Sequence, residues 1–209
     1  ISGGEETPAF QATINVENGY IKNPELPQPV EDIQFSAEAS NELLTISSLD
    51  ARAGTNDLRA TGQMERPLEE EGTFSLNFTS NVDLATVNSF YDLNSLGVES
   101  LGGQLDVQAQ ASGNRNNPEN VTFNTTLRLE EGVLKYRDVP KPIENININA
   151  DANQDVVIVR NISLEASRNT FSMKGTVSNP LKEDNRMVDL NTNLRFDLAT
   201  IKDFYPISE

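Results

Sequence analysis

Apolar and polar residues alternate along most of this chain with a period of two. Near the N-terminus, Phe10, Ala12, Ile14 and Val16 alternate with polar residues. The same alternation recurs in the segments 33–39, 58–64, 74–78, 101–111, 121–129, 146–152, 171–177 and 188–196. Strict alternation gives a strand one dry and one wet face, which is typical of antiparallel sheets. The pattern therefore predicts an all-β fold.

Two short segments have helical spacing instead. They follow Asp83 and Asp197, and each places apolar residues on one face of a helix. A carboxylate just before a helix accepts hydrogen bonds from the free amides of its first turn. We therefore predict two short helices that are capped by Asp83 and Asp197 and pack Phe90 and Phe204 onto the sheet.

The chain contains two near-copies of one sequence unit. The offset is 113 residues from Gly19 to Gly132, and it becomes 114 from Asp83 to Asp197 after one inserted residue. Each copy has the same order of alternating segments, proline-rich connection and capped helix. Repeated units of this kind bury their apolar faces against neighbours. The repeat predicts a stacked, extended architecture more than a single pocket.

The repeat also sets the expected domain organisation. The strand-like segment 101–111 precedes the second copy, and its counterpart in the first copy would begin before residue 1. We therefore expect residues 1–93 to be a first copy that begins within a repeat. Residues 94–209 are the second copy with its leading strand. Together they should form one continuous unit, a tandem repeat of curved, mainly antiparallel sheet shaped as a trough.

Charge and residue types argue against several classes of function. The formal net charge is −16, from 16 basic and 32 acidic residues, which opposes binding to nucleic acid. The chain has no His and no Cys, so the commonest general base, thiol nucleophiles and the main zinc ligands are missing. Phosphate-loop and dinucleotide fingerprints are also absent. We predict no enzymatic activity, no cofactor, no metal site and no nucleic-acid partner.

The dry face of the strands has three interpretations. It fits the sealed core of a sandwich or barrel, which would make the chain a structural scaffold. It also fits an open groove that holds an apolar ligand. The third interpretation is an adhesin or carbohydrate-binding repeat, but the chain has no Trp to stack on sugar rings.

The order of several short motifs, present in both copies, is similar to a known family. In the second copy the motifs are Gly103-Gln-Leu105, Glu131-Gly132-Val133-Leu134, Val139-Pro140-Lys-Pro142-Ile143, 171–177 (Phe-Ser-Met-Lys-Gly-Thr-Val), Asn179-Pro180-Leu181 and Asp197-Leu198-Ala199. From residue 100 to the C-terminus the chain resembles the C-terminal region of the AsmA-like family of Gram-negative envelope proteins. The first copy repeats the same order, so the resemblance spans nearly the whole chain.

The resemblance implies a location and a function. Such proteins lie in the periplasm, carry an inner-membrane anchor that would lie outside this sequence, and form a long β-trough with an apolar lining. Related TamB-like proteins carry phospholipid between the inner and outer membranes. The expected role is a non-enzymatic module for lipid transport and outer-membrane homeostasis, with acyl chains as the partner. The alternative is a structural or adhesin-like β-repeat with a sealed core.

We expect the groove to be lined by apolar residues from corresponding strands of the two copies and from the strand that joins them. These residues are Ile14, Val16, Ile33, Phe35, Leu105, Val107, Leu127, Leu129, Ile146 and Ile148.

Overall fold

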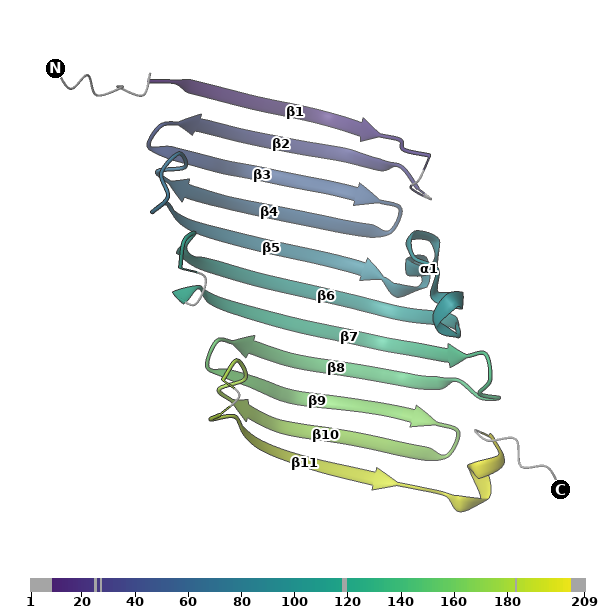
Figure 1. The fold of residues 1–209 in the computed structure, drawn as a ribbon. Helices are drawn as coiled ribbons and strands as arrows, with labels where there is room; N and C mark the ends of the chain where they lie inside the picture. The colour runs from purple at the N-terminus through teal and green to yellow at the C-terminus, as the bar shows by residue number, and fades with distance from the viewer. Residues whose placement is uncertain (1–8, 25, 27, 118–119, 183, 204–209) are drawn as a thin grey trace.

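The computed structural model describes residues 9–24, 26, 28–117, 120–182 and 184–203. In this part of the chain, eleven strands form one antiparallel sheet in which each strand pairs with the next along the chain (Figure 1). The predicted all-β fold is therefore confirmed. The strands are β1 (Gln11–Ile21), β2 (Val30–Ser40), β3 (Leu43–Ala53), β4 (Asn56–Glu65), β5 (Thr73–Asp83), β6 (Val98–Asn114), β7 (Thr122–Tyr136), β8 (Ile143–Asn153), β9 (Val156–Ala166), β10 (Asn169–Ser178) and β11 (Met187–Arg195).

Short helical turns follow β5 and β11. The turns η1 (Leu84–Thr86), α1 (Val87–Phe90) and η2 (Leu93–Leu96) connect β5 to β6, and η4 (Leu198–Asp203) follows β11. The sequence pattern does not predict η2. Phe90 is 41% exposed, so its side chain is only partly covered. Helix α1 is a single turn that follows the end of β5 and contacts β6 (Figure 1). Phe204 lies outside the described residues.

The sequence repeat is also a repeat of backbone conformation. Strands β2, β3 and β4 begin and end 113 residues before β8, β9 and β10. Residues with positive φ follow the same offset: Asn18 and Glu131 have φ of 54° and 53°, and Asp32 and Asn145 have 53° and 50°. Non-glycine residues seldom adopt this conformation. The two copies therefore follow the same path even at their irregular positions.

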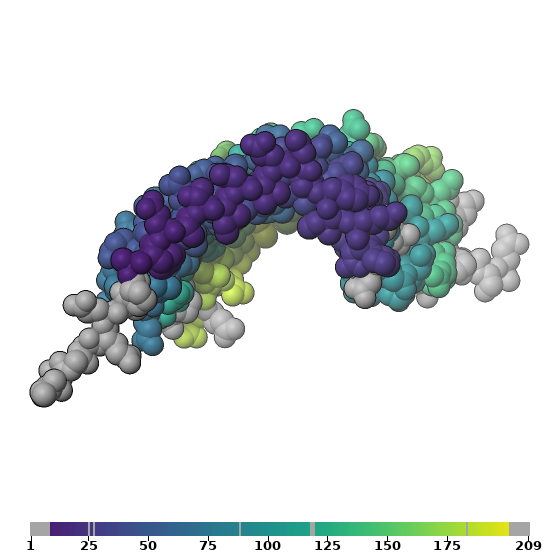
Figure 2. All heavy atoms as spheres, turned by 90° about the horizontal axis from the view of Figure 1, so that it is seen from above, coloured from purple at the N-terminus to yellow at the C-terminus, as the bar shows by residue number. Residues whose placement is uncertain are grey.

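β-Bulges bend the strands into a trough. The register shifts twice between β1 and β2, and twice between the equivalent strands β7 and β8. A bulge adds a residue to one strand, bends it and increases its twist. Beside these bulges, a Cβ on Gly19 would lie 2.9 Å from the Cβ of Ile33, and one on Gly132 would lie 2.9 Å from that of Ile146. Figure 2 shows the resulting arch, which is hollow along its inner side.

The sheet is a single layer. Among the described residues, the buried apolar side chains are Ala37, Leu93, Val98, Leu129 and Val159. The strands contact their neighbours in the sheet, and the β5–β6 connection contacts β6. At ~4.8 Å between strands, the trough is about 50 Å long. Within the described ranges, no second layer covers the concave face, and no helix is long and apolar enough to cross a bilayer.

Candidate functional site

The concave face carries all ten apolar residues that the sequence analysis assigns to a groove. In the β1–β2 pair Val16 lies opposite Phe35, and in the β6–β7 pair Leu105 lies opposite Leu129. Residues that lie opposite each other on neighbouring strands share a face, so the register can be followed across the sheet. The ten residues form two groups, on β1–β2 and on β6–β8, which β3, β4 and β5 separate.

The central group belongs to an unbroken apolar row across five strands. Val82 of β5 lies opposite Leu105, which lies opposite Leu129, then Ile148, then Ile162 of β9. Opposite Cβ atoms in a sheet are about 4.5–5.5 Å apart, so these side chains touch. Leu129, in the middle of the row, is only 9% exposed. The row runs along the trough and across the strands.

The part of the concave face between the two groups is lined by residues that were not predicted as groove residues. Here a hollow of about 180 Å³ opens on β3, β4 and β5. It is lined mainly by Leu44, Ile46, Gly62, Met64, Phe74 and Leu76. The lack of a side chain on Gly62 opens its floor, since a Cβ there would lie 2.8 Å from the carbonyl oxygen of Ser75. The alternation at 58–64 and 74–78 is the signal that could have identified Met64, Phe74 and Leu76.

The concave face is uncharged. At the paired positions of β1 to β11 that the structure describes, no Asp, Glu, Lys or Arg faces the concave side. The polar exceptions near its middle are small, such as Ser80 opposite Val107 and Thr125 opposite Ala109. An apolar chain on this surface would meet no buried charge, which is the most costly neighbour for hydrocarbon.

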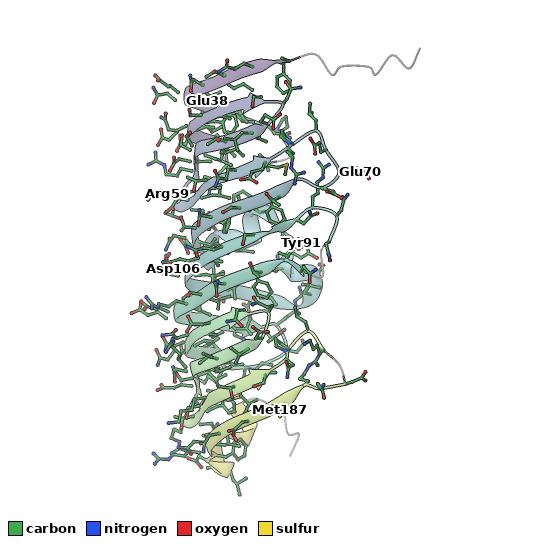
Figure 3. All side chains as sticks on the ribbon, turned by 90° about the vertical axis from the view of Figure 1, so that its left-hand side faces the viewer. Glu38, Arg59, Glu70, Tyr91, Asp106 and Met187 are labelled. Atoms are coloured by element: carbon green, nitrogen blue, oxygen red, sulfur yellow. The ribbon has the colours of Figure 1, made fainter. Side chains whose placement is uncertain are left out.

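The convex face is polar and charged. Figure 3 shows Glu38, Arg59 and Asp106 on the outer side of the curve. Arg59 pairs with Asp50, their Nε and Oδ1 atoms 3.3 Å apart. The amide of Asn81 donates to a carboxylate oxygen of Asp106 at 2.7 Å. The two faces of the sheet thus differ sharply in chemistry.

Asp151 of β8 lies on the convex face, opposite Thr126 of β7. The Thr126 hydroxyl donates to its carboxylate at 2.9 Å, and Arg160 lies 2.5 Å from the other carboxylate oxygen. The hydroxyl of Thr126 and the charges of Arg160 and Arg128 lower the pKa of Asp151, against an opposing effect of desolvation. A hollow of about 380 Å³ beside it is lined largely by amide and hydroxyl side chains. These contacts describe a hydrated polar surface.

The two predicted cap residues lie in equivalent hydrogen-bonded clusters, one in each copy. Asp83 accepts from the amide of Ala85 at 3.0 Å, and Asp197 accepts from Ala199 at 2.9 Å. In the second copy the Asn169 side chain accepts from the Asp197 amide at 2.7 Å and donates to the hydroxyl of Thr200 at 2.8 Å. In the first copy Asn56 makes the equivalent bonds to Asp83 and Thr86, both at 2.8 Å. This cluster fixes the turn that ends each copy.

The described residues hold no cluster of candidate metal ligands. Among them, no group of three or more acidic side chains could hold a metal ion. The concave face is a long apolar surface whose side chains are half-buried and accessible from one side. Such a surface favours contact with another apolar body.

Comparison with known proteins adds no relative. No family model, no curated protein and no solved structure matches this chain.

Proposed function

We propose that the concave face binds lipid acyl chains along the trough. In this proposal the chain is a non-enzymatic module of an AsmA-like periplasmic protein that carries phospholipid between the inner and outer membranes. The observation that carries the proposal is an uncharged apolar face on a single-layer sheet, uncovered within the described residues, opposite a charged outer face. Water is a poor environment for such a face, and hydrocarbon is a good one.

The dimensions of the trough suit acyl chains. A bilayer core is about 30 Å thick, so the chains of one leaflet extend about 15 Å. The trough is about 50 Å long at ~4.8 Å per strand, so several chain lengths fit along it. A buried methylene gains ~0.8 kcal/mol, so about a dozen half-buried methylenes would gain about 5 kcal/mol before entropic costs. The acyl chain would therefore be bound but could still move along the trough.

The uniform lining supports movement as well as binding. The register repeats apolar side chains from strand to strand, and neither a charge nor a deep enclosed pocket interrupts them at the paired positions described. A chain that advances by one strand would exchange one set of aliphatic contacts for a similar set. We therefore favour a conduit over a storage site.

The alternative function is a structural repeat whose apolar face is sealed by another protein layer. It requires a second apolar surface of similar length to cover the trough. A photo-crosslinker on the concave face distinguishes the two alternatives, because it forms a covalent adduct with lipid in one case and with protein in the other.

The proposal is tested by photo-crosslinking in a Gram-negative host. Benzoylphenylalanine replaces Leu127 on the concave face or Asn124 on the convex face of the same strand. We expect lipid adducts, identified by mass spectrometry, at Leu127 and none at Asn124. Protein adducts alone at Leu127, in a variant whose circular dichroism matches the unsubstituted chain, would favour the scaffold. Equal lipid labelling at both positions would mean non-specific contact.

A further inference from the structure

We propose that a groove on the convex face of β5–β9 binds a neutral glycan strand that carries N-acetyl groups. The groove is the hollow of about 380 Å³ beside Asp151. It lies on strands in the interior of the sheet, on the opposite face from the trough. The inference is therefore independent of what the concave face binds.

Two rows of side chains form the walls of the groove. Each row crosses the sheet, because residues that lie opposite each other on neighbouring strands share a face. The first row consists of the amides Asn77, Gln110, Asn124 and Asn153. The second row consists of Thr79, Gln108, Thr126, Asp151 and Ile158. Five strands at ~4.8 Å spacing make the groove about 19 Å long, which suits an extended polymer better than a small molecule.

The amide row has hydrogen-bonding capacity that the fold leaves unused. Gln110 and Asn124 are exposed, and neither side chain forms a hydrogen bond with another described residue. Asn153 accepts from the backbone amide of Val156 at 2.8 Å through its carbonyl oxygen, which leaves its NH₂ group as a donor. An Asn or Gln amide offers two donor hydrogens and one acceptor oxygen. The row therefore presents both donors and acceptors to a ligand.

An N-acetyl group matches this lining. It has one N–H donor, one carbonyl acceptor and a methyl group, and the ring hydroxyls beside it also donate and accept. At the β9 end the groove is lined by Val156 and Ile158, whose side chains lie on the convex face. They can pack against the acetyl methyl while the amides bind its polar atoms. In the first copy Thr45 stands in place of Ile158, so this apolar end is specific to the second copy.

The charge of the chain favours a neutral glycan over an acidic one. The formal net charge of −16 repels polysaccharides that carry carboxylates or phosphates. Within the wall, Asp151 adds a negative charge, and the neighbouring Arg160 is already paired with it.

A peptide fits this groove less well than a glycan. Strands β5–β9 are each paired on both sides, so their backbones have no free edge to which a peptide strand could be added. The floor of the groove therefore offers no backbone ladder, and recognition falls to the amide and hydroxyl side chains of the walls.

Calorimetric titration of the full chain with soluble tetrasaccharides tests the proposal. The probe is chitotetraose, and the control is cellotetraose, which has the same linkage but lacks N-acetyl groups. We expect saturable binding of chitotetraose, and binding of cellotetraose that is about fivefold weaker or less, as the loss of one good hydrogen bond predicts. No saturable binding of chitotetraose, or equal affinity for the two sugars, would overturn the proposal.

A capped tetraglycine is the second control, because it carries amides without sugar rings. We expect it not to bind. If it binds as well as chitotetraose, the groove recognises peptide amides, and the glycan proposal is overturned in favour of a protein partner.

Side-chain variants locate the site. Gln110→Ala should weaken chitotetraose binding about two- to tenfold, which is the effect of losing one hydrogen bond. Gln104→Ala is the matched control, since Gln104 is exposed on the same strand and lies opposite Glu130, outside the groove. It should leave the affinity unchanged. Equal losses in the two variants would place the sugar elsewhere and contradict the proposal.

The apolar end is tested by the exchange that the repeat itself contains. Ile158→Thr introduces the residue of the first copy, and circular dichroism should match that of the unsubstituted chain. We expect the preference for chitotetraose over cellotetraose to fall about threefold, because the acetyl methyl loses part of its apolar contact. An unchanged preference in the folded variant would show that Ile158 does not contact the N-acetyl group, and would overturn the assigned site.

Discussion

The two copies resemble each other more closely on the concave face of the sheet than on the convex face. On the concave face, Ile33 of the first copy corresponds to Ile146 of the second, and the apolar character is kept at nearly every equivalent position. On the convex face, Arg52 corresponds to Glu165, so even the sign of the charge changes. The two copies thus share a backbone path and an apolar concave face, whereas the charges on their convex faces differ.

This difference indicates which interactions the fold depends on. The ion pair between Arg59 and Asp50 occurs in the first copy, and serines stand at the equivalent positions of the second. Exposed pairs of this kind contribute about 0–1 kcal/mol. The bulges, the close glycine contacts and the Asn–Asp–Thr clusters occur in both copies. Stability should therefore be sensitive to changes on the concave face and at these shared features.

The largest expected loss of stability comes from placing a charge in the middle of the concave face. Leu129→Asp would place an unpaired carboxylate where the side chain is 9% exposed, and should lower the free energy of unfolding by about 3 kcal/mol or more. Val16 occupies the same repeat position on the edge strand and is 39% exposed, so Val16→Asp should cost about 1 kcal/mol or less. Urea unfolding followed by circular dichroism measures both. Equal losses would mean that β6 does not shield Leu129.

The next effect tests the bulges. A Cβ at Gly132 would lie 2.9 Å from both the Cβ and the carbonyl oxygen of Ile146, so Gly132→Ala should cost about 1–3 kcal/mol. Gly102 is the control, because the nearest atom to its added Cβ is 3.9 Å away, on Val133. Gly102→Ala should be close to neutral. A neutral Gly132→Ala would show that the bulge can relax and does not fix the curvature.

A smaller effect concerns the cluster that ends each copy. Asn169 is 6% exposed and bonds Asp197 and Thr200. Asn169→Ala should cost about 1–2 kcal/mol, because it leaves these groups without their partner. Asn161, whose side-chain bond to Ser163 is exposed and 3.3 Å long, is the control and should be nearly neutral. Similar losses in both variants would contradict a special role for the cluster.

The smallest effect is a pH dependence on the convex face. The pKa of Asp151 is lowered from its usual 3.8, first by the Thr126 hydroxyl and then by Arg160. Its contribution to stability is therefore complete above about pH 4 and is lost as the pH falls through the folded-state pKa. Asp151→Asn should flatten this acid-side loss slightly, and Thr126→Val should do the same. An unchanged slope of stability against pH in both variants would rule out this contribution.

The sequence was sufficient for the strands, the repeat and the caps. Strict alternation identifies strands, and an aspartate before a helical segment identifies a cap, because both signals are local. The openness of the concave face could not be predicted, since the same alternation describes a sealed sandwich. The curvature depends on bulges where Asn18 and Glu131 adopt positive φ. Asparagine favours that conformation but glutamate does not, so residue type alone does not locate both bulges. The hollow beside Gly62 depends on cross-strand register, which one strand's pattern does not fix.

Acyl-chain contact at the concave face is the central claim, and fluorescence quenching tests it most directly. The chain has no tryptophan, so Val107→Trp on the concave face and Gln110→Trp on the convex face of β6 each give a single fluorophore. Phospholipid with brominated acyl chains should quench the Val107→Trp variant and spare the Gln110→Trp variant, while acrylamide quenches both. Equal quenching by the brominated lipid, or none in either variant, would contradict the account.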